Sequence, residues 1–278
     1  MTYEFLKGHG TENDFVLLPD LDGDVHGELT DDLMAERVRA LCDRRAGIGG
    51  DGVLRVVRAM SPDALPDSPQ WFMDYRNADG SLSEMCGNGI RVFVRYLVDQ
   101  GLADGTDPIA VDTRDGVKTL TVDGDQITVD LGTPKVLGES NVSVDGHTWE
   151  ARHVDMGNPH AVAFVDSLDD AGRLLDPPAH DASVYPYGVN VEFVVRRGAR
   201  HIAMRVHERG SGETRSCGTG AGAAMVAAAV ADDARPAGQD VAYRVDVPGG
   251  TLTVTWTADD RVLLTGPAVV VARGTTTL

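Results

Sequence analysis

The spacing of apolar residues along the chain predicts three helices. Residues 31–42 place apolar side chains three to four positions apart, which is typical of an amphipathic helix. Residues 90–98 and 221–230 are apolar segments of helical length, and each follows a glycine-rich turn. The second of these contains almost only Ala, Gly, Val and Met, so it lacks a polar face. We therefore expect a sheet to surround it.

Alternation of apolar and polar residues predicts two hairpins at equivalent places in the chain. Each is closed by a short turn rich in Asp, and each is followed by Gly and then Pro. The strands are residues 118–122 and 126–129 in the first hairpin, and residues 251–255 and 261–264 in the second.

The chain also contains an internal repeat built on two Cys-Gly-x-Gly turns. The turns at residues 86–89 and 217–220 each stand directly before a predicted helix. Asn77 precedes Cys86 by the same interval that separates Glu208 from Cys217. One such turn would indicate only a buried cysteine beside a glycine turn, but two copies in similar surroundings indicate a repeated structural unit.

The repeat predicts an α/β (α+β mixed) fold of two pseudo-symmetric domains. Residues 1–134 would form the half carrying Cys86, completed by a strand at 267–278, and residues 135–266 the half carrying Cys217. We expect the halves to join near residues 133–147. Each half would be a curved mixed sheet or barrel around a central helix. Pseudo-twofold pairing would place the two turns across an interdomain cleft, where small ligands commonly bind.

Charge changes the expected solvent and excludes some partners. The chain of 278 residues has 43 Asp and Glu against 25 Lys and Arg, a formal net charge of −18. This acidic field disfavours binding to nucleic acid and to anionic membranes. The scarcity of lysine beside abundant aspartate indicates adaptation to high salt and a halophilic source, because molar salt screens repulsion between carboxylates. We expect the protein to lose stability in dilute buffer.

Membrane and targeting signals are not evident in the sequence. No apolar run approaches the roughly 20 residues of a membrane span. The first residues contain neither a basic nor an apolar region, so we expect a cytoplasmic protein. Three cysteines do not make a disulfide framework, and Cys42 is expected to be a core thiol in the first helix.

The two remaining thiols stand where a helix N-terminus would stabilise a thiolate and bind a carboxylate. A structural zinc site needs four ligands with Cys-x-x-Cys type spacing, which is absent, as is a redox Cys-x-x-Cys motif. None of Lys7, Lys118 and Lys135 has a context recognisable as a Schiff-base site for pyridoxal phosphate. We therefore expect neither a metal nor a cofactor.

Proton transfer is the use that two thiols fit best. Inverting a stereocentre beside a carboxylate needs a base on one face and an acid on the other. A thiolate and a thiol exchange these roles when one proton passes through the substrate, and helix N-termini stabilise the negative charge that develops. The sequence thus predicts a cofactor-independent amino-acid racemase or epimerase that uses Cys86 and Cys217.

Seven short motifs stand out along the chain, at residues 10–15, 77–81, 86–89, 156–160, 188–193, 208–210 and 217–220. Together they resemble those of the diaminopimelate epimerases, and the resemblance covers nearly the whole chain. These enzymes interconvert L,L- and meso-diaminopimelate without pyridoxal phosphate, in the biosynthesis of lysine and cell-wall precursors.

The resemblance implies a set of site residues and a homodimer. Cys86 and Cys217 would be the proton-transfer thiols. The reacting carboxylate would be bound by backbone N–H groups of Gly87, Asn88, Gly218 and Thr219. Asn13, His160 and Glu208 would lie near the reacting amine, the last two also helping to set thiol protonation. The distal, non-reacting centre would be held by Asn77, Asn158, Asn190 and Arg209, of which Arg209 can grip a carboxylate bidentately.

One departure and three alternatives remain at this stage. Some members of the family have a Gln where this chain has Gly52, so one contact to the substrate is absent. Proline racemases and hydroxyproline epimerases typically carry His in place of Asn88 and an Asp shortly before the second thiol. A phenazine-pathway isomerase of this fold would lack the paired thiols. A non-catalytic amino-acid-binding protein would keep Arg209 and the asparagines but need neither cysteine.

Overall fold

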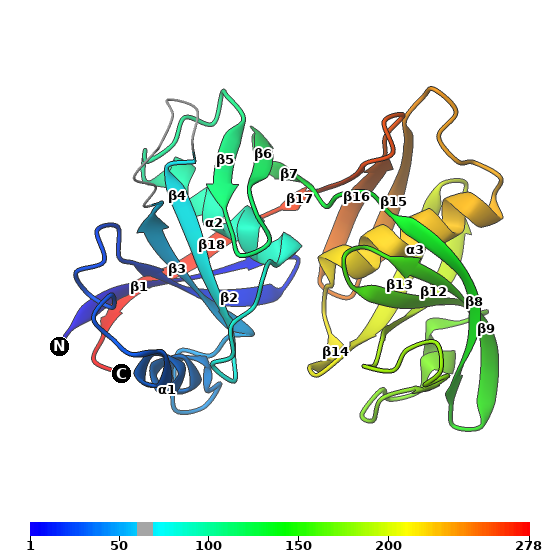
Figure 1. Ribbon diagram of the computed structural model, residues 1–278, viewed down its shortest axis with the longest axis horizontal. Helices are drawn as coiled ribbons and strands as arrows, with labels where there is room; N and C mark the ends of the chain where they lie inside the picture. The colour runs from blue at the N-terminus through cyan, green and yellow to red at the C-terminus, as the bar shows by residue number, and fades with distance from the viewer. Residues whose placement is uncertain (60–68) are drawn as a thin grey trace. The chain divides into compact units, whose positions relative to one another are not determined.

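The computed structural model describes residues 1–59 and 69–278, which fold into two compact units (Figure 1). Unit 1 consists of residues 1–129 together with 267–278, and unit 2 of residues 130–266. In unit 1 the last strand of the chain, β18 (Val269–Thr276), pairs antiparallel with the first, β1 (Tyr3–Gly10). Both chain ends therefore belong to the same unit.

Unit 1 is a mixed sheet with two helices. The strands pair in the order β18-β1-β2-β3-β4-β5-β6-β7, in which β2–β3 and β4–β5 are parallel and the other pairs antiparallel. The further elements are β2 (Asn13–Pro19), α1 (Asp31–Cys42), β3 (Gly52–Arg58), β4 (Trp71–Asn77), α2 (Gly87–Asp99), β5 (Ile109–Asp112), β6 (Lys118–Asp123) and β7 (Gln126–Asp130).

The two helices of unit 1 pack on different strands. Helix α2 contacts β1, β2, β3 and β18, and most of its residues are buried. Helix α1 begins at Thr30, whose hydroxyl accepts the N–H of Leu33, and it packs against β3 and β4. Cys42, at its end, is buried in the apolar cluster beneath it, and burial raises the pKa of this thiol to about 12. The prediction of a core thiol is confirmed.

Unit 2 wraps a long mixed sheet around one helix. The strands pair in the order β11-β8-β9-β10-β12-β13-β15-β16-β17, with β10–β12 and β13–β15 parallel and β14 added to β13. The elements are β8 (Lys135–Val144), β9 (His147–Asp155), β10 (Pro159–Phe164), a short 3₁₀ helix (Leu168–Ala171), β11 (Ala179–His180), β12 (Asn190–Gly198), β13 (His201–Glu208), β14 (Gly212–Thr214), α3 (Gly218–Ala231), β15 (Val241–Val247), β16 (Gly250–Trp256) and β17 (Val262–Pro267).

Helix α3 has the surroundings that its apolar sequence predicts. It contacts β9, β10, β12, β13, β15 and β16, and residues 220–229 are buried all round. Figure 1 shows the helix lying along these strands. The three predicted helices and both predicted hairpins are present. No helix among the described residues is long and apolar enough to span a bilayer.

The segment expected to join the two halves is a strand of unit 2. Residues 135–144 form β8, which pairs with β9 inside unit 2. The strand has a register shift between Val136 and Gly138, and most of its first half is exposed. Its residues therefore lack the regular alternation of apolar and polar positions by which half-buried strands are recognised.

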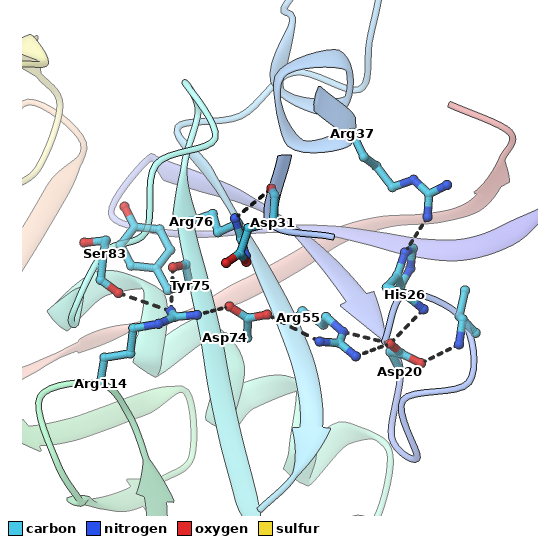
Figure 2. Close-up of polar contacts among 11 residues, drawn as sticks. Asp20, His26, Asp31, Arg37, Arg55, Asp74, Tyr75, Arg76, Ser83 and Arg114 are labelled. Atoms are coloured by element: carbon cyan, nitrogen blue, oxygen red, sulfur yellow. Dashed lines mark hydrogen bonds and ion pairs between the residues drawn. The ribbon is translucent and has the colours of Figure 1, made fainter. Parts of the chain in front are cut away.

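A row of paired charged side chains crosses the strands of unit 1 (Figure 2). The guanidinium of Arg55 donates to Asp20 at 2.7 Å and to Asp74 at 3.5 Å. Asp74 also accepts from Arg114. At the other end of this row, the Asp20 carboxylate accepts backbone N–H groups of the β2–α1 loop, including that of His26 at 3.0 Å. Each buried carboxylate thus has a cationic partner, which offsets the cost of removing it from water.

His26 lies at the Asp20 end of this row of side chains and is held neutral. Its Nδ1 faces the Arg37 guanidinium at 2.8 Å, so the ring nitrogen accepts and carries no proton there. Burial lowers the pKa of His26 to about 4; the Asp20 carboxylate opposes this shift, and Arg37 and Arg55 add to it. The unfolded chain, with a His pKa near 6.5, therefore binds more protons than the folded chain between these two values.

We expect the free energy of unfolding to fall as the pH decreases from about 6.5 towards 4, because protonation of His26 favours the unfolded chain. His26→Gln, which keeps an acceptor for Arg37, should remove about 1–2 kcal/mol of the loss between pH 7 and 5. Urea unfolding of both proteins at pH 7 and pH 5 measures this change in the free energy of unfolding. His147→Gln, at an exposed position, is the matched control. An equal pH dependence in wild type and His26→Gln would contradict this prediction.

Candidate active site

Each unit contains one cysteine at the N-cap of a buried helix. The Sγ atom of Cys86 accepts the N–H of Gly89 at 3.4 Å, and the Sγ atom of Cys217 accepts the N–H of Gly220 at 3.4 Å. Both cysteines have extended backbones, and each is followed by a helix whose positive end points at its sulfur. The residues that open the two helices are Gly87 and Asn88 in α2 and Gly218 and Thr219 in α3, and their backbone N–H groups lie at the positive ends of the helices.

Asn13 lies against the thiol in unit 1. Its Oδ1 accepts from the Cys86 thiol at 3.6 Å and from Nδ2 of the buried Asn88 at 3.2 Å. Its Nδ2 donates to Asp51 at 2.7 Å, and Asp51 also accepts the backbone N–H of Asp14 at 3.1 Å. Asp51 thereby fixes the Asn13 amide with its oxygen towards the sulfur.

Asp51 sits in a small charged cluster that sequence reasoning did not assign to the site. Arg44 bridges Asp51 and Asp14, with distances of 2.7 Å to both carboxylates, and Lys7 contacts Asp14 at 2.5 Å. Burial raises the pKa of Asp51, and the Asp14 carboxylate adds to this rise, while the hydrogen bond from Asn13 opposes it. The signal in the sequence was the Gly-x-Gly-x-Asp turn that contains Asp51.

Asn77 has its hydrogen-bond partners elsewhere in unit 1. It lies at the end of β4, accepts from the Tyr75 hydroxyl at 2.9 Å and donates to the Ser81 hydroxyl at 3.1 Å. Arg114 donates to the carbonyl groups of Tyr75 and Ser83 (Figure 2). These bonds fasten the segment that leads from β4 to Cys86.

Gly52 cannot be replaced without a backbone shift. A Cβ atom there would lie 2.6 Å from the carbonyl oxygen of Arg76 and 2.7 Å from the ring of Tyr75. The close pairing of β3 with β4 therefore requires glycine at this position in the present structure.

A continuous set of polar contacts leads away from the thiol of unit 2. The Sγ atom of Cys217 and the hydroxyl of Thr219 are 3.6 Å apart. Asn158 donates to the same hydroxyl at 3.4 Å, and the Oδ1 of Asn158 lies 3.0 Å from Nε2 of His160. Four of the residues expected at the site are thus brought together.

His160 is paired with a carboxylate that the sequence analysis did not select. Its Nδ1 lies 2.6 Å from Oε1 of Glu192, and both side chains are 0% exposed. The pair forms because β10 and β12 are parallel neighbours, with His160 beside Asn190 and Val162 beside Glu192. The signal for Glu192 was a charged residue within the apolar run Val191–Val195.

Glu208 supplies a second carboxylate at the Cys217 thiol. It accepts from the Thr214 hydroxyl and is hydrogen-bonded to Cys217. Burial raises the pKa of Cys217 well above its usual range, and the carboxylates of Glu208 and Glu192 raise it further, against the opposing N–H of Gly220. The local field therefore favours the thiol over the thiolate at this sulfur.

Asn190 and Arg209 lie together at the edge of unit 2. The backbone N–H of Arg209 donates to Oδ1 of Asn190 at 2.9 Å, and Nδ2 of Asn190 donates to the Pro159 carbonyl at 3.2 Å. Arg209 is exposed, and its guanidinium donates to the Tyr187 carbonyl at 3.3 Å. Asn190 thus fixes the backbone from which this cation projects.

Among the described residues there is no group of three or more His, Cys, Asp or Glu side chains arranged to hold a metal ion. The polar groups around the sulfurs are amides, carboxylates, a hydroxyl and one imidazole. Such groups bind and orient substrates through hydrogen bonds and move protons.

Comparison with solved structures assigns the fold to a class that includes amino-acid epimerases. A phenazine biosynthesis protein of the PhzF family from Bacillus anthracis superposes with a TM-score of 0.75 at 16% identity, covering 100% of both chains. A hydroxyproline epimerase from Agrobacterium vitis superposes with a TM-score of 0.66 at 14% identity, covering 100% of this chain and 93% of the other. At these identities the likeness concerns the fold alone.

Comparison of sequences identifies the family within that class. The family model for diaminopimelate epimerase matches residues 5–137 and 152–271. The diaminopimelate epimerase of Streptomyces coelicolor is 57% identical over 97% of this chain and 94% of its own length. The chain belongs to the diaminopimelate epimerase family and is an isomerase.

The contact between Glu192 and the first turn of α3 generates a prediction. A Cβ atom on Gly220 would lie 2.8 Å from Oε1 of Glu192 and 3.2 Å from Sγ of Cys217. Gly220→Ala should therefore displace the carboxylate or the thiol and lower epimerase activity about 10–100-fold, although alanine favours the helix.

Gly222→Ala is the matched control, because it adds the same methyl group to the same helix. Its Cβ would meet flexible apolar side chains, the nearest being Met156 at 3.3 Å. We expect it to retain activity, with circular dichroism confirming the fold of both variants. Equal activity of the two variants would show that the Gly220 contact does not matter.

Proposed function

We propose that the protein converts L,L-diaminopimelate to meso-diaminopimelate in lysine biosynthesis, by proton transfer at Cα between Cys86 and Cys217 without a cofactor. The observation that carries the proposal is the pair of N-cap thiols, one in each unit, at equivalent positions of a repeated structure. Membership of the diaminopimelate epimerase family supports the choice of substrate.

The reaction needs one sulfur as thiolate and the other as thiol. The thiolate removes the α-proton from one face of the substrate, and the thiol delivers its proton to the opposite face of Cα. The two sulfurs have then exchanged protonation states, so the reverse reaction uses the same groups. Burial of Cys217 and the neighbouring Glu208 carboxylate favour its thiol form in the resting enzyme.

The helix N-termini would stabilise the charge that develops as the proton leaves. Deprotonation at Cα delocalises negative charge onto the reacting carboxylate, and preorganised N–H groups are most effective for such charge. We assign this contact to Gly87, Asn88, Gly218 and Thr219, which open the two helices.

The remaining site residues divide between the two ends of the substrate. We assign Asn13, His160 and Glu208 to the reacting amine. Asn13 and Glu208 lie beside a sulfur, and His160 is linked to Cys217 through Asn158 and Thr219. We assign Asn77, Asn158, Asn190 and Arg209 to the distal L-centre. The exposed guanidinium of Arg209 can bind the second carboxylate, which a proline substrate lacks.

Replacing either sulfur should abolish the reaction. We expect Cys86→Ala and Cys217→Ala to lower epimerisation of L,L-diaminopimelate by about 10²–10⁴-fold, because each removes one acid–base group. Wild-type enzyme in D₂O should incorporate deuterium at the substrate α-position. Cys42→Ala, which removes a core thiol, is the control and should remain active.

The same assay separates this function from its alternatives. Near wild-type turnover in either variant would refute the two-thiol mechanism. Racemisation of L-proline, with no reaction of diaminopimelate, would identify the protein as a proline racemase type of enzyme. Binding of diaminopimelate without α-proton exchange would identify a non-catalytic binding protein.

We further propose that the enzyme is a cytoplasmic homodimer adapted to high salt. The family resemblance favours the dimer. The formal net charge of −18 and the excess of acidic over basic residues support the adaptation to salt.

Salt should stabilise the folded enzyme. Repulsion among exposed carboxylates weakens as the Debye length falls from about 10 Å at 0.1 M to about 3 Å at 1 M salt. We expect the thermal unfolding midpoint to rise between about 0.1 M and several molar KCl. A midpoint that stays constant over this range would exclude the adaptation.

A further inference from the structure

Glu192 is a fully buried carboxylate for which the proposed reaction has no role. It stands in the first half of β12, between Val191 and Phe193, and none of its surface is exposed. A carboxylate buried in this way is costly unless it is paired. The Glu192 carboxylate therefore requires a partner, and its position among apolar residues suggests a function.

The partner is His160, and the pair determines where protons can lie. Nδ1 of His160 faces Glu192 Oε1 at 2.6 Å, and Nε2 faces the Asn158 amide oxygen at 3.0 Å. An amide oxygen can only accept, so Nε2 must carry a proton.

This arrangement also orients Asn158. With its oxygen held by Nε2–H, the Asn158 side chain presents its NH₂ group to the Thr219 hydroxyl at 3.4 Å. That hydroxyl in turn lies 3.6 Å from Sγ of Cys217. The amide direction at Asn158 therefore depends on the proton at Nε2, and this depends on the carboxylate at Nδ1.

Glu192 also lies directly beneath the first turn of α3. Its Oε1 is 2.8 Å from the position that a Cβ on Gly220 would occupy, and Sγ of Cys217 is 3.2 Å from the same point. Its other oxygen, Oε2, is buried and has no hydrogen-bond partner among residues 1–59 and 69–278. Burial raises the pKa of Glu192, and the His160 ring opposes this rise.

We propose that Glu192 is a positioning residue of the Cys217 half of the site, which holds His160 and Asn158 in one orientation and places a negative charge beneath the sulfur. The inference rests on the proposed role of Cys217 and concerns a residue that does not touch the substrate.

The charged groups around Cys217 determine how removal of the Glu192 charge should change the pKa of the thiol. Glu208 faces the thiol from β13, Glu192 from β12, and the His160 ring lies on β10. After burial, the two carboxylates are the largest causes of the raised pKa of Cys217. Loss of the Glu192 charge should therefore ease ionisation of this thiol.

Because the chain has three cysteines, Cys217 can be studied as a single thiol in a Cys42→Ala, Cys86→Ala background. We expect Glu192→Gln to lower the midpoint of the pH profile for alkylation of Cys217 by iodoacetamide by about one pH unit. Below the midpoint, alkylation would then be about tenfold faster at a fixed pH. Glu192→Asp, which restores the charge, should return the midpoint towards that of the parent.

Glu150→Gln provides the matched control, because it makes the same chemical change at an exposed position of β9. Its alkylation profile should equal that of the parent. An unchanged profile in folded Glu192→Gln, or an equal shift in Glu150→Gln, would overturn the proposal.

A measurement on the wild-type enzyme tests the same inference without a variant of Glu192. In ¹⁵N-histidine-labelled protein, with His160→Gln used only to assign the signal, Nε2 of His160 should be protonated. A resting tautomer with a bare Nε2 would overturn the orientation assigned to Asn158. Neither test requires turnover. Failure of the enzyme to epimerise diaminopimelate would reject the proposed function, while the alkylation profile and the His160 tautomer would still decide whether Glu192 is a positioning residue.

Discussion

The hydrogen bond from a helix N–H to a cysteine sulfur is the interaction on which the rest of the site depends. It requires an extended cysteine, a glycine three residues later and a helix that starts at once, and the chain meets these conditions twice, at Cys86 and Cys217. Each helix is largely buried against its own sheet. Water therefore screens the field at the helix ends poorly, and this field can act on a thiolate or on a bound carboxylate.

The two copies keep the same backbone but surround the sulfur with different groups. Cys86 faces the neutral amide of Asn13, whereas Cys217 lies beside the carboxylates of Glu208 and Glu192. A neighbouring negative charge opposes ionisation of a thiol much more strongly than a neutral dipole does. The two thiols, alike in their helix caps, therefore have different electrostatic surroundings, and in the proposed mechanism these surroundings distinguish the acid from the base.

Helices, hairpins and the repeat could be predicted because their signals are local: periodicity, glycine turns and an apolar helix without a polar face. Strand β8 could not, since its bulge and exposed side chains remove the alternation. Asp51 and Glu192 were missed for a different reason. Their partners Asn13 and His160 are 38 and 32 residues away, and only the parallel pairings β2–β3 and β10–β12 bring them together. Spacing in sequence carries no direct sign of such contacts.

The acidic character of the chain therefore has two parts that respond differently to solvent. Exposed carboxylates account for much of the net charge of −18, and added salt screens their repulsion over a few ångströms. Glu192 is not exposed at all, and mobile ions cannot approach its carboxylate closely. Salt can consequently alter the stability of the fold while the field at Cys217 stays nearly constant. A charge placed beside the thiol inside the protein therefore acts on Cys217 with a strength that depends little on the ionic strength at the surface.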